Sequence, residues 1–296
     1  MSGPGRRASK FPLRLDDLGS RVQVARTPVP PVSAPLLTIA PKLQATAAAA
    51  RSVLRPQRLV EHAHVDASRR AAPSGIGMDS ADVRSRMAQR LRGAGVSNAT
   101  VLNAMATVPR HLFVDAALVA QAYEDTSLPI GHGQTISKPS VVARMIELLL
   151  GGTTARQSGG LGRVLEIGTG CGYQAAVLAR LGTHVVSVER LRPLHDKARA
   201  LLAPQRPANL RLVYGDGMRG HPPNAPYDSI IAAAGGDELP GAWLEQLALG
   251  GRLISPVRQA GSDRQVLMVV DRTEQGFERN VFEAVHFVPL KSGLVA

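Results

Sequence analysis

A glycine-rich stretch, GTGCG at residues 168–172, is the first feature of this sequence that could do chemistry. It follows the apolar run RVLEI at residues 163–167 and precedes a helical pattern, so it falls where a strand passes into a helix. Gly168, Gly170 and Gly172 allow a tight turn and a close approach to a ligand, and the first N–H groups of the helix attract negative charge. The stretch predicts a nucleotide site.

Two carboxylates follow the next two strand patterns. Glu189 ends the run at residues 184–188 and lies 21 residues after Gly168, where it can accept hydrogen bonds from both ribose hydroxyls. Asp216 follows the third run, and we expect it to accept a hydrogen bond from an adenine amino group while Gly217 admits the ring. Two simpler interpretations stay open, because Glu189 could be only a strand-end charge and Asp216 only a turn former.

The spacing of the glycines narrows the choice of nucleotide. It is GxGxG, whereas dinucleotide sites carry GxGxxG, so the pattern favours an adenosyl ligand without a pyrophosphate. S-adenosylmethionine is the cofactor we expect. Glu166, next to the glycines, is expected to order their loop. Cys171 has no partner base to make it a nucleophile.

A second unusual stretch, GHGQTISKP at residues 131–139, precedes a helical pattern. Thr135 and Ser137 place two hydroxyls on either side of Ile136, and Pro139 suits the first turn of a helix because its missing N–H would be unpaired there. So much backbone freedom and so many hydroxyls predict a loop that holds a polar ligand. Alternatively, these residues could only cap the helix.

Alternating strand and helix patterns position these residues. We expect strands at residues 163–167, 184–188, 210–214, 228–233 and 252–257, and helices at residues 174–181, 191–202 and 240–247. Apolar strands separated by helices indicate a mostly parallel, doubly wound α/β sheet of the Rossmann-like class, covered on both faces. Two further runs without a helix between them, residues 265–271 and 281–290, should add antiparallel strands.

Two amphipathic patterns come before this core. Val83, Met87 and Leu91 recur every fourth residue, with Ser80 able to cap the start of that helix, and Pro109 ends a second pattern. We therefore expect one domain over residues 78–296. Its first part, residues 78–150, would hold the helices and the hydroxyl-bearing loop, and residues 160–296 would hold the nucleotide-binding core.

The first 77 residues differ from the rest. They contain nine prolines and few large side chains in periodic order, so we expect disorder apart from a short helix near residues 45–59. An upstream translation start ahead of Met78 explains the segment equally well. Its net charge of +8 accounts for most of the chain's +12. A basic arm can attract polyanions weakly, yet the core lacks interleaved aromatic and basic residues, so we expect no specific nucleic-acid binding.

The composition of the chain excludes several other classes of protein. The chain of 296 residues has one cysteine, so it has no internal disulfide framework, and a reducing compartment such as the cytoplasm is expected. No Cys/His cluster has the spacing of a zinc site, so no metal is expected. No apolar run approaches the roughly 20 residues needed to cross a bilayer.

Several motifs together resemble one family in order and spacing, namely the protein-L-isoaspartate O-methyltransferases. The motifs are VPRHLFV (108–114), AYEDTSLPIGHGQTISKP (122–139), VLEIGTGCGYQAAVLARL (164–181), SVER (187–190), GDG (215–217), PYDSII (226–231), GGRLISPV (250–257) and VHFVPL (285–290). The resemblance covers about residues 78–296. One departure is AAAGG at residues 232–236, where relatives often carry threonine and prolines.

The resemblance implies methyl transfer from S-adenosylmethionine to the free carboxylate of L-isoaspartyl, and less well D-aspartyl, residues in damaged proteins. The methyl ester then closes to a succinimide, whose hydrolysis restores some normal linkage. Ser137 matches the serine treated as catalytic in the family, and we assign it an orienting hydrogen bond. The implied contacts are cofactor contacts at Thr135, Ile136 and Ser137, and substrate contacts at Gly133, Gln134, Thr135 and Ser137.

An acceptor carboxylate with a pKa of about 4 is already ionised at neutral pH, so this reaction needs no strong base, and the sequence shows none. We expect a monomer that acts on isoaspartyl proteins and peptides. Two alternatives differ in class: a methyltransferase acting on nucleic acid or a small molecule, and a scaffold that only binds an adenosyl ligand. Against the first, no Asn/Asp-Pro-Pro-aromatic motif follows the fourth strand.

Overall fold

The computed structural model describes residues 81–205 and 207–296. The expected disorder of residues 1–77, the expected helix near residues 45–59 and the Ser80 cap lie outside the described residues, as does the question of an upstream start.

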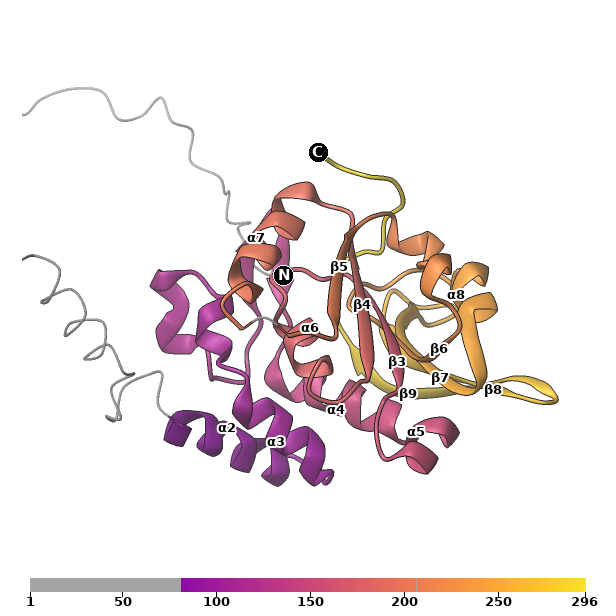
Figure 1. Cartoon of the computed structure of the whole chain (residues 1–296), viewed down its shortest axis with the longest axis horizontal. Helices are drawn as coiled ribbons and strands as arrows, with labels where there is room; N and C mark the ends of the chain where they lie inside the picture. The colour runs from indigo at the N-terminus through magenta and orange to yellow at the C-terminus, as the bar shows by residue number, and fades with distance from the viewer. Residues whose placement is uncertain (1–80, 206) are drawn as a thin grey trace, which may run out of the picture. The chain divides into compact units, whose positions relative to one another are not determined.

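One seven-stranded sheet organises the described chain (Figure 1). Its order is β5-β4-β3-β6-β7-β8-β9, in which β3 to β7 pair in parallel and β8 and β9 are antiparallel, as the sequence predicted. From β3 the chain passes outward through β4 to β5 and then crosses back to β6 on the other side of β3, so a crevice opens at the carboxyl ends of the strands. The strands are β3 (Arg163–Ile167), β4 (His184–Glu189), β5 (Leu210–Tyr214), β6 (Tyr227–Ala232), β7 (Leu247–Arg258), β8 (Gln265–Thr273) and β9 (Gly276–Val285).

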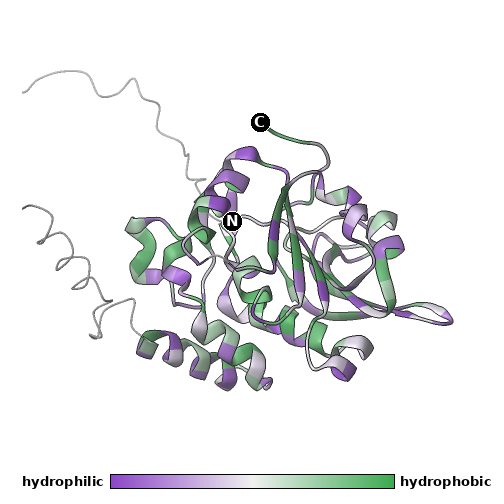
Figure 2. Cartoon of the chain, in the orientation of Figure 1, coloured by the Kyte–Doolittle hydropathy of each residue, from purple (hydrophilic) through white to green (hydrophobic). Residues whose placement is uncertain are grey.

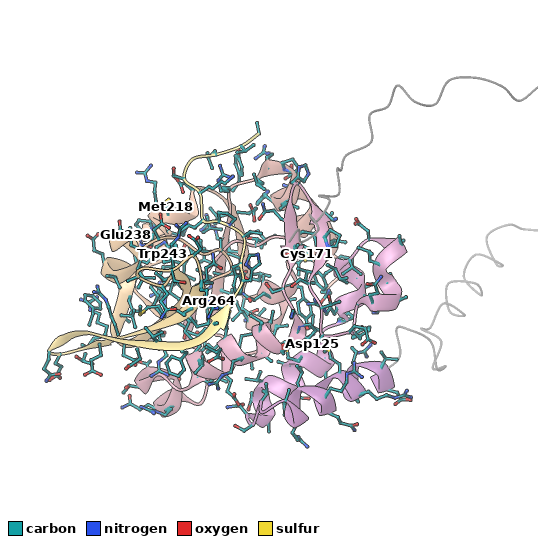
Figure 3. The ribbon with its side chains drawn as sticks, turned by 180° about the vertical axis from the view of Figure 1, so that it is seen from behind. Asp125, Cys171, Met218, Glu238, Trp243 and Arg264 are labelled. Carbon is teal, nitrogen blue, oxygen red and sulfur yellow. The ribbon has the colours of Figure 1, made fainter. Side chains whose placement is uncertain are left out.

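Helices cover both faces of this sheet because its buried strands are apolar on both sides. Val164 belongs to a core cluster that includes buried residues of α4, α6 and α7, whereas its neighbour Leu165 belongs to a second cluster with Trp243 of α8. Figure 3 shows the labelled Cys171 and Trp243 well apart in the molecule. The helices are α4 (Pro139–Leu150), α5 (Thr153–Ser158), α6 (Tyr173–Leu178), α7 (Arg192–Leu202) and α8 (Gly241–Gln246).

Hydropathy follows this layering. In Figure 2 green predominates along the middle strands of the sheet, and the outer helices α2 and α7 carry purple residues. Leu194, Ala198 and Leu202 form the buried stripe of α7, at the spacing of an amphipathic helix.

The chain before the sheet is helical. Met87 and Leu91 are the buried residues of α2, as the periodicity predicted. Asn98 caps α3, since its Oδ1 accepts the N–H groups of Thr100 and Val101. The segments are α2 (Ala81–Gly93), α3 (Ala99–Thr107) and the 3₁₀ turns η2 (Arg110–Phe113) and η3 (Ala116–Gln121); two further 3₁₀ turns, η4 (Gly217–Arg219) and η5 (Pro222–Asn224), follow β5.

A short hairpin precedes α4 where the sequence indicated only a loop. It pairs β1 (Leu128–Gly131) with β2 (Gln134–Ile136) in antiparallel register. Its two turn residues, His132 and Gly133, have φ of 54° and 67°, which is the backbone of a type I′ turn. Strands of three and four residues are too short to show the alternation that identifies a strand, and the histidine replaces the usual Asn or Asp.

Candidate active site

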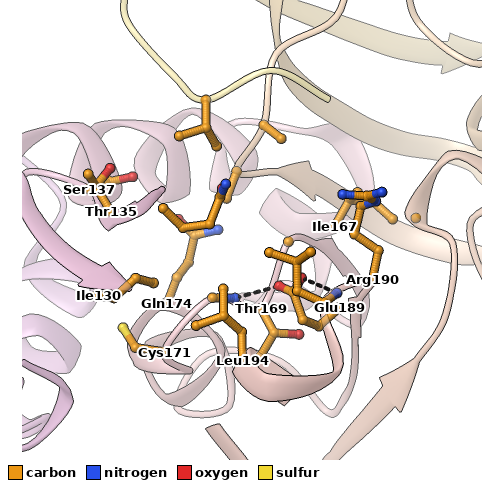
Figure 4. A pocket seen from close by; sticks show the side chains of 18 of the residues that line it. Ile130, Thr135, Ser137, Ile167, Thr169, Cys171, Gln174, Glu189, Arg190 and Leu194 are labelled. Atoms are coloured by element: carbon orange, nitrogen blue, oxygen red, sulfur yellow. Dashed lines mark hydrogen bonds between the residues drawn. The ribbon is translucent and has the colours of Figure 1, made fainter. Parts of the chain in front are cut away.

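A cleft of about 240 Å³ opens at the carboxyl ends of β3 and β4 (Figure 4). Residues 134–137, which we call the hydroxyl loop, form one wall, and Figure 4 shows Thr135 and Ser137 there, across the cleft from Glu189. The other walls come from residues 168–171, from the chain after β4 and from residues 288–291. Two motifs about thirty residues apart in the sequence thus face the same space.

The glycine loop, residues 168–172, leaves β3 through three left-handed residues: φ is 91° at Gly168, 55° at Gly170 and 92° at Gly172. A side chain at any of them would be strained. Gly168 and Gly170 lie on the cleft wall, whereas Gly172 does not. A Cβ at Gly172 would lie 2.8 Å from Leu202 Cδ1, so this glycine lets α6 pack against α7.

Glu189 is the ionisable side chain best placed to hold a ligand. It lines the cleft although it is 5% exposed. Its Oε2 accepts the backbone N–H of Gly170 at 2.9 Å and its Oε1 accepts that of Leu191 at 2.9 Å. Since a carboxylate offers about four acceptor positions, each oxygen can still accept another hydrogen bond. A vicinal diol supplies two such donors.

Asp216 lies off the cleft wall, with both carboxylate oxygens bonded to backbone N–H groups. Its Oδ1 accepts the Met218 N–H at 3.0 Å and its Oδ2 accepts the Gly293 N–H at 2.7 Å. It is not on the cleft wall, whereas Gly217 is. A Cβ at Gly217 would lie 2.6 Å from Ile167 Cγ2, so no larger residue fits there without movement.

The hydroxyl loop lines the cleft along its whole length. Ile136 is 4% exposed and belongs to the core, yet it borders the cleft together with Thr135 and Ser137. Gln134 also lines the cleft, but Gly133, in the hairpin turn, does not. None of these side chains caps α4; Asp125, from the preceding loop, accepts the N–H of Ser140 instead.

A second cavity adjoins the cleft. Thr135, Ser137, Ala233 and Val288 line both, so the two hydroxyls stand where the spaces meet. Ala233 belongs to the AAAGG departure, and its small side chain leaves room there. The remaining lining of the second cavity includes Ser127, Lys138, Val141, His286 and Phe287.

Buried titratable groups lie close to the glycine loop. Glu166 is 0% exposed, and burial, with a smaller contribution from the charge of Glu189, raises its pKa to about 8. Its Oε2 accepts the Ser187 hydroxyl at 2.5 Å, and Ser187 bonds Thr169 at 2.6 Å. This chain ties β3 and β4 to the glycine loop, and Glu166 itself is absent from the cleft wall.

Cys171 lines the cleft but is buried, and burial raises the pKa of its thiol to about 11, so the thiolate is scarce near neutral pH.

The described part of the chain brings together no group of three or more His, Cys, Asp or Glu side chains suited to a metal ion. Within residues 81–205 and 207–296, no helix has the length and apolar character needed to cross a bilayer.

The profile of the family described as Protein-L-isoaspartate(D-aspartate) O-methyltransferase (PCMT) matches residues 82–294. This chain belongs to that family. A protein-L-isoaspartate O-methyltransferase of Methylibium petroleiphilum is 55% identical over 99% of both chains, and one of Leptothrix cholodnii is 60% identical over 81% of this chain and 84% of its own.

One solved structure agrees with the assignment to the isoaspartate methyltransferase family, and a second shares the fold. One, a protein-L-isoaspartate O-methyltransferase, is 32% identical with a TM-score of 0.63 and covers 71% of this chain and 67% of its own. A Plasmodium falciparum protein, described as a putative member in complex with S-adenosyl-L-homocysteine, shares the fold with a TM-score of 0.58 at 24% identity, over 70% of this chain and 98% of its own.

Several cleft residues of this isoaspartate methyltransferase family member were not anticipated. Three of them lie next to predicted motifs in the chain, namely Tyr173, Arg190 and Leu194. Their proximity to those motifs could have indicated that they line the cleft. Residues 288–291 had no local signal, because they reach the cleft from beyond the last strand. Only the VHFVPL motif of the family resemblance pointed to them.

Proposed function

We propose that this protein transfers a methyl group from S-adenosylmethionine to the free carboxylate of L-isoaspartyl residues, and less readily D-aspartyl residues, in damaged proteins. The observation that carries the proposal is the position of Thr135 and Ser137 across one cleft from Glu189. Membership of the isoaspartate methyltransferase family supports the same reaction.

The residues of the cleft fit the cofactor. The two oxygens of Glu189 each accept one backbone N–H and have capacity for the two ribose hydroxyls. The cleft wall carries no side chain at Gly168, Gly170 and Gly217, so the ligand can approach the backbone closely there. The other side of the cleft is lined by Ile136 and Ser137. Apolar side chains that include Ile167, Val188 and Leu191 offer a surface for flat and aliphatic parts.

The adenine contact is assigned to Asp216. Asp216 keeps acceptor capacity beside the N–H groups of Met218 and Gly293, and we assign that capacity to the adenine amino group. Gly217 brings the backbone next to it onto the cleft wall. Because the Gly293 N–H uses the same carboxylate, the end of the chain and the adenine are expected to share or exchange this acceptor.

The chemistry is a direct transfer. Bound S-adenosylmethionine supplies an electrophilic methyl group. The acceptor carboxylate is ionised at neutral pH, so the protein removes no proton, and alignment is the main task. Well-aligned groups lower a barrier by roughly 7–11 kcal/mol at the upper limit. We assign that alignment to hydrogen bonds donated by Thr135 and Ser137 to the acceptor.

The second cavity is the proposed entry for the damaged peptide. It meets the cleft at Thr135 and Ser137, and Lys138 and His286 lie on its lining. A cation near the entry favours the anionic acceptor. After transfer, the neighbouring backbone nitrogen attacks the ester carbonyl carbon and methanol leaves with the proton of that nitrogen, so the succinimide closes without further help from the protein.

We further propose that the protein acts as a monomer in the cytoplasm. A single buried, free cysteine is compatible with a reducing compartment. Sedimentation velocity on the purified protein would test the first point, because a stable dimer would sediment as a clearly larger species.

The function is tested with purified protein, S-adenosylmethionine labelled in its methyl group, and two peptides that differ only in an isoaspartyl or a normal aspartyl linkage. We expect base-labile label on the isoaspartyl peptide alone. Equal labelling of both peptides would refute the substrate assignment. Label on RNA or on a small molecule, with none on either peptide, would support a different methyltransferase.

A further inference from the structure

Arg110 is a buried arginine beside the cleft that no part of the mechanism has yet used. It opens η2 and is 0% exposed. Its Nε donates to the carbonyl oxygen of Ala122 at 2.8 Å, and its Nη2 donates to the carbonyl oxygen of Ser137 at 2.7 Å. A longer contact of 3.5 Å joins Nη2 to the carbonyl oxygen of Thr126. The guanidinium therefore holds the backbone of the hydroxyl loop.

The flat face of the same guanidinium meets the other side of the site. Its Cζ lies 4.8 Å from the centroid of the Tyr173 ring. Tyr173 is 1% exposed, lines the cleft and begins α6 directly after the glycine loop. Arg110 thus contacts both segments that the proposed reaction must bring into register.

Burial of the Arg110 guanidinium is energetically unfavourable. No carboxylate within residues 81–205 and 207–296 forms an ion pair with Arg110, and its Nη1 is buried without a hydrogen-bond partner. Burial lowers the pKa of Arg110, but an arginine remains charged at neutral pH. Removing a cation from water is unfavourable, and carbonyl groups and a ring face offset that cost only in part. A methionine would fill the volume without that cost.

We propose that Arg110 is a positioning residue that sets the Ser137 hydroxyl at a fixed place relative to the glycine loop and so aligns acceptor and cofactor. The inference rests on the proposed function, since it names what holds that site in register. Arg110 is not on the cleft wall and touches no reacting atom. Its planar fork, with separate donors for Ala122 and Ser137, is what a lysine cannot reproduce.

Position should outweigh charge in this role. A nearby cation stabilises the acceptor carboxylate before transfer, and less so in the transition state, where the carboxylate and sulfonium charges cancel. Its field therefore favours binding of the peptide more than the chemical step. A loss of alignment, by contrast, lowers kcat. The two contributions can be separated by measuring KM and kcat.

The test uses Arg110→Lys and Arg110→Met in the full-length chain. We expect kcat to fall by about 100-fold, the effect of a displacement of about 1 Å, while the Kd for S-adenosylhomocysteine stays within about 3-fold by calorimetry. Arg252→Met is the control, because Arg252 also donates to a carbonyl oxygen, that of Leu148, and pairs with Asp271, but lies off the cleft wall. The Arg252→Met variant should have a lower free energy of unfolding. Any change in its kcat should be matched by an equal change in its affinity for S-adenosylhomocysteine.

A double-mutant cycle tests whether Arg110 acts through Ser137. In the Ser137→Ala background the hydroxyl to be positioned is gone, so Arg110→Lys should cost much less than it does alone. Additive losses would overturn the proposal. So would an unchanged kcat, or a loss of cofactor affinity as large as the loss of kcat.

Hydrogen exchange gives a readout that needs no substrate. Arg110→Lys should speed amide exchange in residues 135–142 and leave residues 163–189 protected. If the wild type fails to methylate the isoaspartyl peptide, the proposed function falls, and this measurement alone decides the role of Arg110. Unchanged exchange in residues 135–142 would then overturn it.

Discussion

Asp125 holds Ser140 with both oxygens of its carboxylate. Its Oδ1 accepts the Ser140 backbone N–H at 2.8 Å and its Oδ2 accepts the Ser140 hydroxyl at 2.7 Å. The β1–β2 hairpin lies between these two residues in the chain. Lys138, at the N-cap position of α4, makes no side-chain capping bond, so Asp125 replaces it. The hairpin that presents Thr135 and Ser137 is therefore anchored at both ends.

Removing this anchor with Asp125→Ala should lower the free energy of unfolding by about 1 kcal/mol, the usual value of a helix cap. It should also slow methyl transfer, because the hydroxyl loop loses an anchor. Urea unfolding and kcat with the isoaspartyl peptide measure the two effects. Asn98→Ala is the control, since Asn98 caps α3 away from the cleft. Equal slowing by both variants would show that the loss comes from stability alone.

Ser137→Ala should slow methyl transfer by about 10- to 100-fold, which corresponds to the loss of one hydrogen bond to a charged group. The Kd for S-adenosylhomocysteine should change little, because Glu189 and the glycine loop keep their contacts. Single-turnover rates and calorimetry separate the two quantities. Ser158→Ala, in the last position of α5, serves as a control. Turnover at the wild-type rate would remove Ser137 from the mechanism.

Glu189→Gln should weaken binding of S-adenosylhomocysteine by about 10- to 100-fold. The amide keeps the shape of the carboxylate but turns an N–H₂ group toward the backbone N–H of Gly170 or Leu191, two donors that bonded the carboxylate. Calorimetry measures the change, and Glu278→Gln on β9 is the control. An unaltered affinity would mean that the ribose lies elsewhere.

Glu166 predicts a pH dependence of stability. Burial raises its pKa from 4.5 to about 8 in the folded protein, so the folded state holds a proton that the unfolded state has released in that interval. The contribution of Glu166 to the free energy of unfolding is therefore full below its unfolded pKa and is lost as pH rises toward about 8, by about 1.4 kcal/mol per pH unit.

The Glu166→Gln variant isolates this contribution, because it cannot titrate. Urea unfolding of both proteins between about pH 5 and about pH 8 should show the variant gaining stability relative to the wild type as pH rises. A difference that stays constant over this range would show that Glu166 is ionised in the folded protein at neutral pH.

The core of the fold could be predicted because its strands are short apolar runs between helices. The runs at residues 163–167 and 210–214 match β3 and β5 at both ends. The helix expected at residues 174–181 ends at Leu178, and the carbonyl oxygen of Ala179, just beyond it, accepts a hydrogen bond from the side-chain amide of Asn209. Helix ends depend on such tertiary bonds, which periodicity does not reveal.

The site was predictable to a similar extent. The positions of Glu189, Gly168 and Gly170 on one cleft could be predicted because the carboxyl ends of neighbouring parallel strands meet at one edge of a sheet. The hydrogen bond from the Gly293 N–H to Asp216 could not be predicted, since the two residues are 77 positions apart. Arg110 was also missed as a site residue, because a buried arginine has no periodic signature and its partners are carbonyl groups, which every residue has.

The most direct test of the account is a crystal structure of the protein with S-adenosylhomocysteine and an isoaspartyl peptide. We predict the ribose on Glu189 and the isoaspartyl carboxylate beside Thr135 and Ser137, with an oxygen about 3–3.5 Å from the place of the transferable methyl group. A peptide bound away from the hydroxyl loop, or a cofactor away from Glu189, would contradict it.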